Sequence, residues 1–176
     1  MPKPRKTLGA VDSPYIVSLM RLIETQSKPT LMSWCLDYAE VRILPIYERR
    51  RPGDSRPAHA IAASRAWIAG QLKLPEVKKI ILGECHAAAR ELDSDTAAQA
   101  AARAIGQAAG SIHAPTHSLG MAFYGAAAVA YDQVGLDQAA DVYDGIAARE
   151  CAKMEAALRS IAVENEPNPA KINWNC

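Results

Sequence analysis

The feature that most constrains this fold is a series of apolar residues three and four apart, in alanine-rich segments separated by prolines. Alanine has the highest helix propensity and a small side chain, so such segments favour helices that pack closely. Runs of Val, Ile, Thr and aromatic residues, which are typical of strands, are almost absent. The clearest stripe is Leu136, Ala140, Tyr143, Ala147, Cys151, Met154, Leu158 and Ile161. The sequence therefore predicts an all-α protein.

Prolines and capping residues divide the chain into six or seven predicted helices joined by short turns. The predicted ranges are about 14–25, 31–48, 57–71, 75–92, 96–112, 115–134 and 136–164. Thr30 is expected to cap the second helix, and Pro45 to kink or shorten it. Short connections favour antiparallel neighbours, so we expect a compact antiparallel multi-helix bundle with an alanine-rich core.

The length of 176 residues suits one domain. We expect an N-terminal extension at 1–29 that could carry a short helix, the helical bundle at 30–165, and a tail at 166–176. Trp174 in the tail is expected to contact either the body of the protein or a partner.

Several classes of function lack support in the composition. The net charge of +1 gives no overall field to attract nucleic acid or a membrane, and no segment is long and apolar enough to span a bilayer. No phosphate-binding loop, dinucleotide fingerprint or nucleophile elbow occurs, so no cofactor is expected. The four cysteines lack metal-ligand or redox spacing, and three lie in predicted helices. We therefore expect buried thiols and a soluble cytoplasmic protein.

Two histidines in the segment GSIHAPTHSLG, His113 and His117, have the spacing that places two metal ligands on one helix face. Pro115 between them argues against a continuous helix, so His113 should end one helix and His117 begin the next. The rings could still meet across the turn, but a zinc site needs further ligands. We expect structural roles, or else a contact with a partner or ligand, and no metal.

Arginine at position 65 falls within a predicted apolar stripe of Ile61, Arg65, Ile68 and Leu72. A buried arginine needs a partner, so Arg65 is either a structural clamp or a residue that holds an anionic group. The candidate polar cluster for binding or structure comprises Arg56, Arg65, Trp67, Arg103, His113 and His117. Nearby in the sequence, Gly106 and Gly110 are expected to allow close packing of helices.

An acidic surface is the second candidate site, formed by Asp132, Asp137, Asp141 and Asp144. Acidic residues in the first half of a helix are ordinary, because they complement the helix dipole. The alternative is an interface that recognises a basic protein.

Four segments resemble the immunity-protein family of bacterial polymorphic toxin systems known as the Imm-five-like group, over about 34–135. They are CLDYAEVRILPIYE (35–48), PGDSRPAHAIAASRAWIAG (52–70), AAARELDSDTAAQAAARAIGQAAGSIH (87–113) and THSLGMAFYGAAAVA (116–130). The R-A-W-x-x-G and H-x-x-x-H portions are the most discriminating. The acidic residues at 137–144 lie outside the resemblance.

The resemblance implies an all-helical cytoplasmic protein that binds and blocks a cognate protein toxin without catalysis. It transfers no catalytic residues. One alternative is an enzyme or small-ligand-binding bundle that uses Arg65, Arg103, His113 and His117 around an internal polar cavity. Another is a homo-oligomer that associates through alanine-rich faces.

Overall fold

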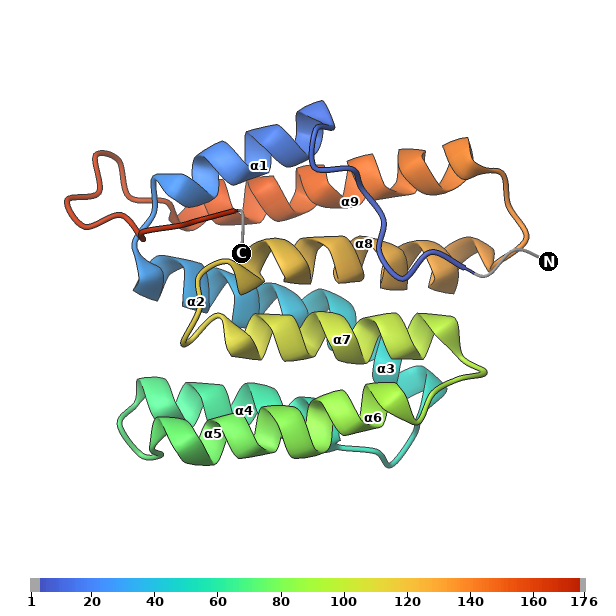
Figure 1. Cartoon of the computed structure of the whole chain (residues 1–176), viewed down its shortest axis with the longest axis horizontal. Helices are drawn as coiled ribbons and strands as arrows, with labels where there is room; N and C mark the ends of the chain where they lie inside the picture. The colour runs from blue at the N-terminus through green and yellow to red at the C-terminus, as the bar shows by residue number, and fades with distance from the viewer. Residues whose placement is uncertain (1–3, 175–176) are drawn as a thin grey trace.

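The computed structural model describes residues 4–174, which contain seven helical rods and no strand (Figure 1). Two rods each contain a π-helical turn, and the other five are single α-helices. The rods are α1 (Pro14–Glu24); α2 (Lys28–Tyr38), η1 (Ala39–Ile43) and α3 (Leu44–Arg50); α4 (Arg56–Ile68); α5 (Leu74–Ile80), η2 (Ile81–Cys85) and α6 (His86–Arg90); α7 (Thr96–Gly110); α8 (His117–Val134); and α9 (Ala140–Ile161). The predicted all-α class and number of helices are confirmed.

The helices run roughly along the long axis of the molecule (Figure 1). In that view α1 and α9 lie at the top, α8, α2 and α7 in the middle, and α4, α5 and α6 at the bottom. Helix α7 packs against α2, α3, α4, α6 and α8, and eleven of its fifteen residues are buried. Most of those eleven are alanine or glycine, whose small side chains let five neighbours surround one helix.

Helix starts follow local capping chemistry, with one correction to the prediction. The second rod begins at Lys28, where the Ser27 hydroxyl accepts a hydrogen bond from the Thr30 backbone N–H. Ser27 is therefore the cap, and the prediction that Thr30 caps this helix was wrong. Serine here satisfies one of the free N–H groups that every helix start leaves.

The two π-helical turns were not predicted. The turn η1 ends at Ile43, two residues before Pro45, which has no backbone N–H to donate to the preceding turn. The second rod therefore continues through Pro45, with a wider π-helical turn before it, and does not end there. The second turn, η2, contains no proline, and no local feature of the sequence accounts for it.

The predicted inward faces are confirmed in part. Val77, Ile81, Cys85, Ala88 and Leu92 are all buried, as expected. The stripe on α9 is buried from Tyr143 to Leu158, but its predicted ends are exposed: Leu136 lies outside the helix, and Ala140 and Ile161 are its first and last residues.

The predicted stripe on α4 was right at Ile61 and wrong at Ile68. Ile68 is 47% exposed, and the α4 residues that face the core are Pro57, Ala60, Ile61, Ala63 and Ser64. Consequently, the Arg65 side chain lies at the surface.

Both ends of the chain pack on the bundle. Leu8 is fully buried, and the Tyr131 hydroxyl donates a hydrogen bond of 2.6 Å to the Arg5 carbonyl. In the tail, the Trp174 indole N–H donates to Glu24 at 2.7 Å, and the Ala170 N–H donates to the Gln26 carbonyl. Of the two expectations for Trp174, contact with the body is the one observed.

The cysteines behave as small apolar residues. Cys35, Cys85 and Cys151 are free and fully buried, as predicted, while Cys176 lies outside the described residues. Burial raises the pKa of Cys85 and of Cys151 to about 12, so neither thiol is a nucleophile near neutral pH. Within residues 4–174, no helix is sufficiently long and apolar to span a membrane.

Candidate functional site

The candidate polar residues do not converge on one site. Arg56 forms ion pairs with Asp54 at 2.8 Å and Glu91 at 2.7 Å, which join the start of α4 to the end of the α6 rod. Arg65 pairs with Asp37 and Glu40, and its side chain is 39% exposed. These arginines are surface clamps between neighbouring rods rather than parts of an internal cavity.

The remaining members of that cluster lie elsewhere. Trp67 is partly buried against the core. The Arg103 guanidinium lies 5.8 Å from the centre of the Tyr124 ring, a cation–π distance. Only His113 and His117 come together, with ring centroids 5.3 Å apart and planes at 64°.

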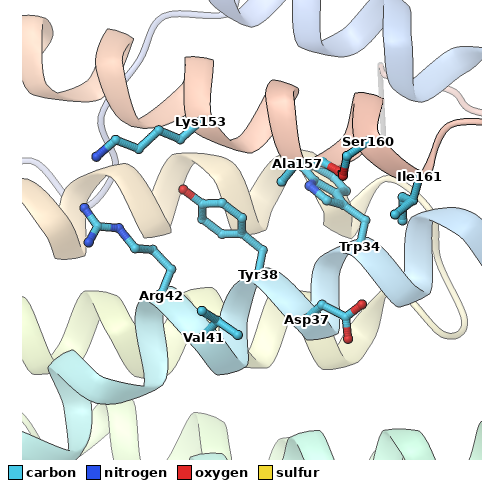
Figure 2. Close-up of a pocket in the computed structure, with 9 residues that line it drawn as sticks. All are labelled: Trp34, Asp37, Tyr38, Val41, Arg42, Lys153, Ala157, Ser160 and Ile161. Atoms are coloured by element: carbon cyan, nitrogen blue, oxygen red, sulfur yellow. The ribbon is translucent and has the colours of Figure 1, made fainter.

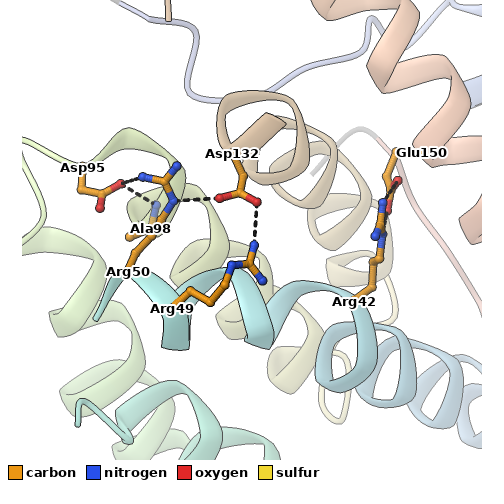
Figure 3. A network of polar contacts seen from close by, with 7 residues as sticks. All are labelled: Arg42, Arg49, Arg50, Asp95, Ala98, Asp132 and Glu150. Carbon is orange, nitrogen blue, oxygen red and sulfur yellow. Dashed lines mark hydrogen bonds and ion pairs between the residues drawn. The ribbon is translucent and has the colours of Figure 1, made fainter. Parts of the chain in front are cut away.

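The four aspartates likewise have separate surroundings, and Figure 3 shows Asp132 between Arg49 and Arg50. Asp132 accepts hydrogen bonds from Arg49 at 2.7 Å and from Arg50 at 3.0 Å, and Arg50 also bonds Asp95. Asp144 pairs with Arg5 at 2.9 Å, and Asp141 bonds the neighbouring backbone N–H. Asp137 is exposed in the α8–α9 connection. A basic partner at this surface stays a prediction, although cations of the chain itself already neutralise two of the four charges.

An apolar groove between the second rod and α9 is the larger candidate site (Figure 2). It has a volume of about 500 Å³, and most of its lining surface is apolar. Val41 in η1 is 78% exposed at its edge and Ile161 is 42% exposed. The other lining residues are Trp34, Asp37, Tyr38, Arg42, Lys153, Ala157 and Ser160. Exposed apolar side chains of this kind mark contact surfaces more often than isolated surface residues do.

A buried carboxylate organises one end of the groove. Glu150 on α9 is 1% exposed and accepts hydrogen bonds from the Tyr38 hydroxyl at 2.7 Å and from Arg42 at 2.9 and 3.1 Å. Burial alone would raise the pKa of Glu150, but the hydrogen bonds from Arg42 and Tyr38 outweigh it and leave the pKa lowered. Lys153 contacts the same carboxylate at 3.4 Å. Two cations thus share one anion.

The other end of the groove carries a surplus of negative charge. Asp37 and Glu40, about half exposed, share the single cation Arg65. Figure 2 shows Arg42 and Lys153 at one end of the groove, Tyr38 in the middle, and Asp37 and Trp34 toward the other end. Trp34 is fixed there by a 3.0 Å hydrogen bond from its indole N–H to the Met154 carbonyl. The groove therefore has an apolar middle, a positive end and a negative end.

A second, smaller cavity contains three of the four histidines. Its volume is about 170 Å³, and it lies between η2, the start of α6, α7 and the α7–α8 turn. His86 comes from α6, His113 from the turn and His117 from the first position of α8. The remaining lining residues are Lys78, Ile81, Leu82, Gly106 and Gly110.

Glycine in α7 makes room for these rings. A Cβ added at Gly106 would stand 2.5 Å from Cε1 of His86, and one at Gly110 would stand 3.1 Å from Cδ2 of His117. The close approach predicted at these glycines therefore exists, but it is made by imidazole rings rather than by another helix axis.

Among residues 4–174, no group of three or more His, Cys, Asp and Glu side chains is arranged to hold a metal ion. His117 Nδ1 is already engaged by the Gln107 side-chain oxygen at 2.7 Å.

Comparison with known families gives a match over residues 21–157 to the family described as "Imm-5 like putative immunity protein". This range covers more than half of the chain. The chain belongs to this family. The match extends beyond the 34–135 resemblance at both ends. It includes most of α9, with Glu150 and Lys153 at the positive end of the groove. No curated protein and no solved structure matches this immunity-family chain significantly.

Reasoning from the sequence missed the groove and His86. Val41 and Arg42 fall in a π-helical turn, which a count of 3.6 residues per turn does not anticipate. His86 meets His117 only because two rods pack side by side, so no spacing in the sequence indicates it. One signal was present for the groove: glutamate occurs at position 150 amid apolar α9 positions, which implies a buried partner.

Proposed function

We propose that this chain is an immunity protein that binds a cognate bacterial protein toxin in the cytoplasm and blocks it without catalysis. Membership of the immunity family over residues 21–157 carries this proposal. Inhibition by occlusion needs a complementary surface with a desolvated apolar centre and a polar rim, not a set of reacting groups.

We further propose the apolar groove as the contact surface, and a segment of the toxin as its occupant. Trp34 and Tyr38 are held rigidly by hydrogen bonds to α9, so little conformational entropy is lost when a partner covers them. The surplus positive charge at Arg42 and Lys153 favours an acidic side chain, and the surplus negative charge at Asp37 and Glu40 favours a basic one. The complementary segment is therefore apolar in its middle and carries opposite charges at its two ends.

Co-expression tests the function itself. The chain is produced together with the toxin encoded by the neighbouring gene, and growth is compared with cells that produce the toxin alone. We expect the chain to restore growth. Undiminished killing, with the chain present as folded protein, would contradict the proposal.

Charge substitutions test the surface. Val41→Asp and Ile161→Asp place a charge at exposed edges of the groove, where folding should tolerate it. Each should weaken toxin binding by about 10-fold or more, because the bound toxin segment would cover the new aspartate and desolvate it without a partner. Val11→Asp is the matched control, since Val11 is 64% exposed and does not line the groove. Equal affinity of the toxin for wild type and the three variants would exclude the groove as the contact surface, without contradicting the proposed immunity function.

A further inference from the structure

We propose that the cavity lined by His86, His113 and His117 binds a small oxyanion, namely the carboxylate or phosphate group of a small molecule. This site is separate from the groove, and it does not depend on the proposed function. Two features support it: the charges around the cavity, and one buried ring nitrogen, His113 Nδ1, that has no hydrogen-bond partner among the described residues.

Cations dominate the surroundings of the three imidazoles. Lys78 on α5 lines the cavity, and no carboxylate does. The cations that act on the rings are Lys28 at the start of α2, Lys78, Arg90 on α6 and Arg103 on α7, joined by His117 when it is protonated. An anion placed in the cavity would meet a positive potential without a competing carboxylate of the chain.

One of the three histidines, His113, has unused hydrogen-bonding capacity among the described residues. His113 Nδ1 is buried and has no hydrogen-bond partner among the described residues, a costly arrangement for a polar atom unless a ligand or solvent satisfies it. His117 Nδ1 bonds the Gln107 side-chain oxygen, so that nitrogen is assigned as the donor, and Gln107 fixes the ring orientation.

Protonation makes the site a stronger anion receptor. Burial lowers the pKa of all three histidines, and the neighbouring cations lower those of His86 and His113 further. In the empty cavity the rings are therefore neutral near pH 7. A bound oxyanion would offset the burial penalty of the imidazolium form, so binding and proton uptake must reinforce each other.

The size and shape restrict the ligand. A volume of about 170 Å³ corresponds to roughly five water molecules, enough for a phosphate or carboxylate group with a short apolar substituent. Ile81 and Leu82 in η2 supply apolar surface for that substituent, and Leu82 is 61% exposed at the rim. Gly106 and Gly110 leave the space open, because a methyl group at either would displace a ring.

Proton NMR of the imidazole signals provides the test, with inorganic phosphate and sodium acetate as separate probes and sodium chloride at matched ionic strength as the control. We expect saturable shifts of the His86, His113 and His117 signals and a rise in their pKa. His59 pairs with Glu84 outside the cavity, so its signal should not move. A response to phosphate alone would indicate a phosphate group as the ligand, and a response to acetate alone would indicate a carboxylate.

Two neighbouring lysines give a matched pair of variants. Both are exposed on α5, but only Lys78 lines the cavity. Lys78→Gln should weaken binding of the responding anion about threefold, the effect of one unit charge about 6 Å away in water, and Lys79→Gln should change it much less. The proposal is overturned if neither anion shifts the three histidines, if all four histidines shift alike, if both variants weaken binding equally, or if only added Zn²⁺ produces the response.

Discussion

Glu150 is the residue on which the groove depends most. It is buried, and it joins α9 to the second rod through Tyr38 and Arg42. Glu150→Gln keeps the volume but removes the charge, so we expect a loss of about 1–2 kcal/mol in the free energy of unfolding at pH 7. Asp144→Asn, at the exposed pair with Arg5, should cost less than about 1 kcal/mol. Urea denaturation measures both.

The pH dependence of the Glu150 variant has a definite sign. Because the folded-state pKa of Glu150 is lowered, the stability that it contributes is present above the unfolded value of about 4.3 and is lost as the pH falls through the folded pKa. The difference between wild type and Glu150→Gln should therefore narrow in acid. A difference that stays constant from pH 7 to pH 3 would contradict the assigned hydrogen bonds.

Within the helices, Gly83 and Gly106 should respond in opposite ways to substitution by alanine. A Cβ added at Gly83 in η2 would have no other atom within 4 Å, whereas a Cβ at Gly106 in α7 would meet the His86 ring at 2.5 Å. Alanine gains up to about 1 kcal/mol of helix propensity at either site. Gly83→Ala should therefore raise the thermal midpoint, and Gly106→Ala should lower it through overpacking. If both thermal midpoints rise equally, the His86 ring moves aside at no cost in stability, which contradicts the overpacking expected at Gly106.

Periodicity predicts elements better than it predicts their details. The faces of α7 and of the α5–η2–α6 rod follow from apolar spacing, because continuous burial on one side leaves a regular pattern. The face of α4 was only partly right, since Ile61 is buried but Ile68 is exposed and Arg65 pairs with acids from the neighbouring rod. Local spacing carries no information about which rod lies opposite, and the cavity and groove both form between rods.

The whole molecule should lose stability in mild acid because of its histidines. The folded-state pKa values of His86, His113 and His117 are lowered, so the unfolded chain takes up protons first as the pH falls below about 6.5. The urea midpoint should therefore decrease from pH 7 to pH 5 in chloride buffer. His86→Gln should flatten this decrease, and His59→Gln, outside the cavity, should not. An identical slope in both variants would contradict the assignment to the cavity.

For the whole molecule, the family and the all-α class could be predicted from the sequence, because helix-forming composition and the order of the segments can be recognised without knowing how the helices pack. The contact surface did not follow, because it requires the placement of α9 beside the second rod.

The most direct test of the central claim is calorimetric titration of the purified chain with its purified toxin. We expect a one-to-one complex whose affinity falls in Val41→Asp and Ile161→Asp but not in Val11→Asp. Absence of binding between two folded, active partners would contradict it.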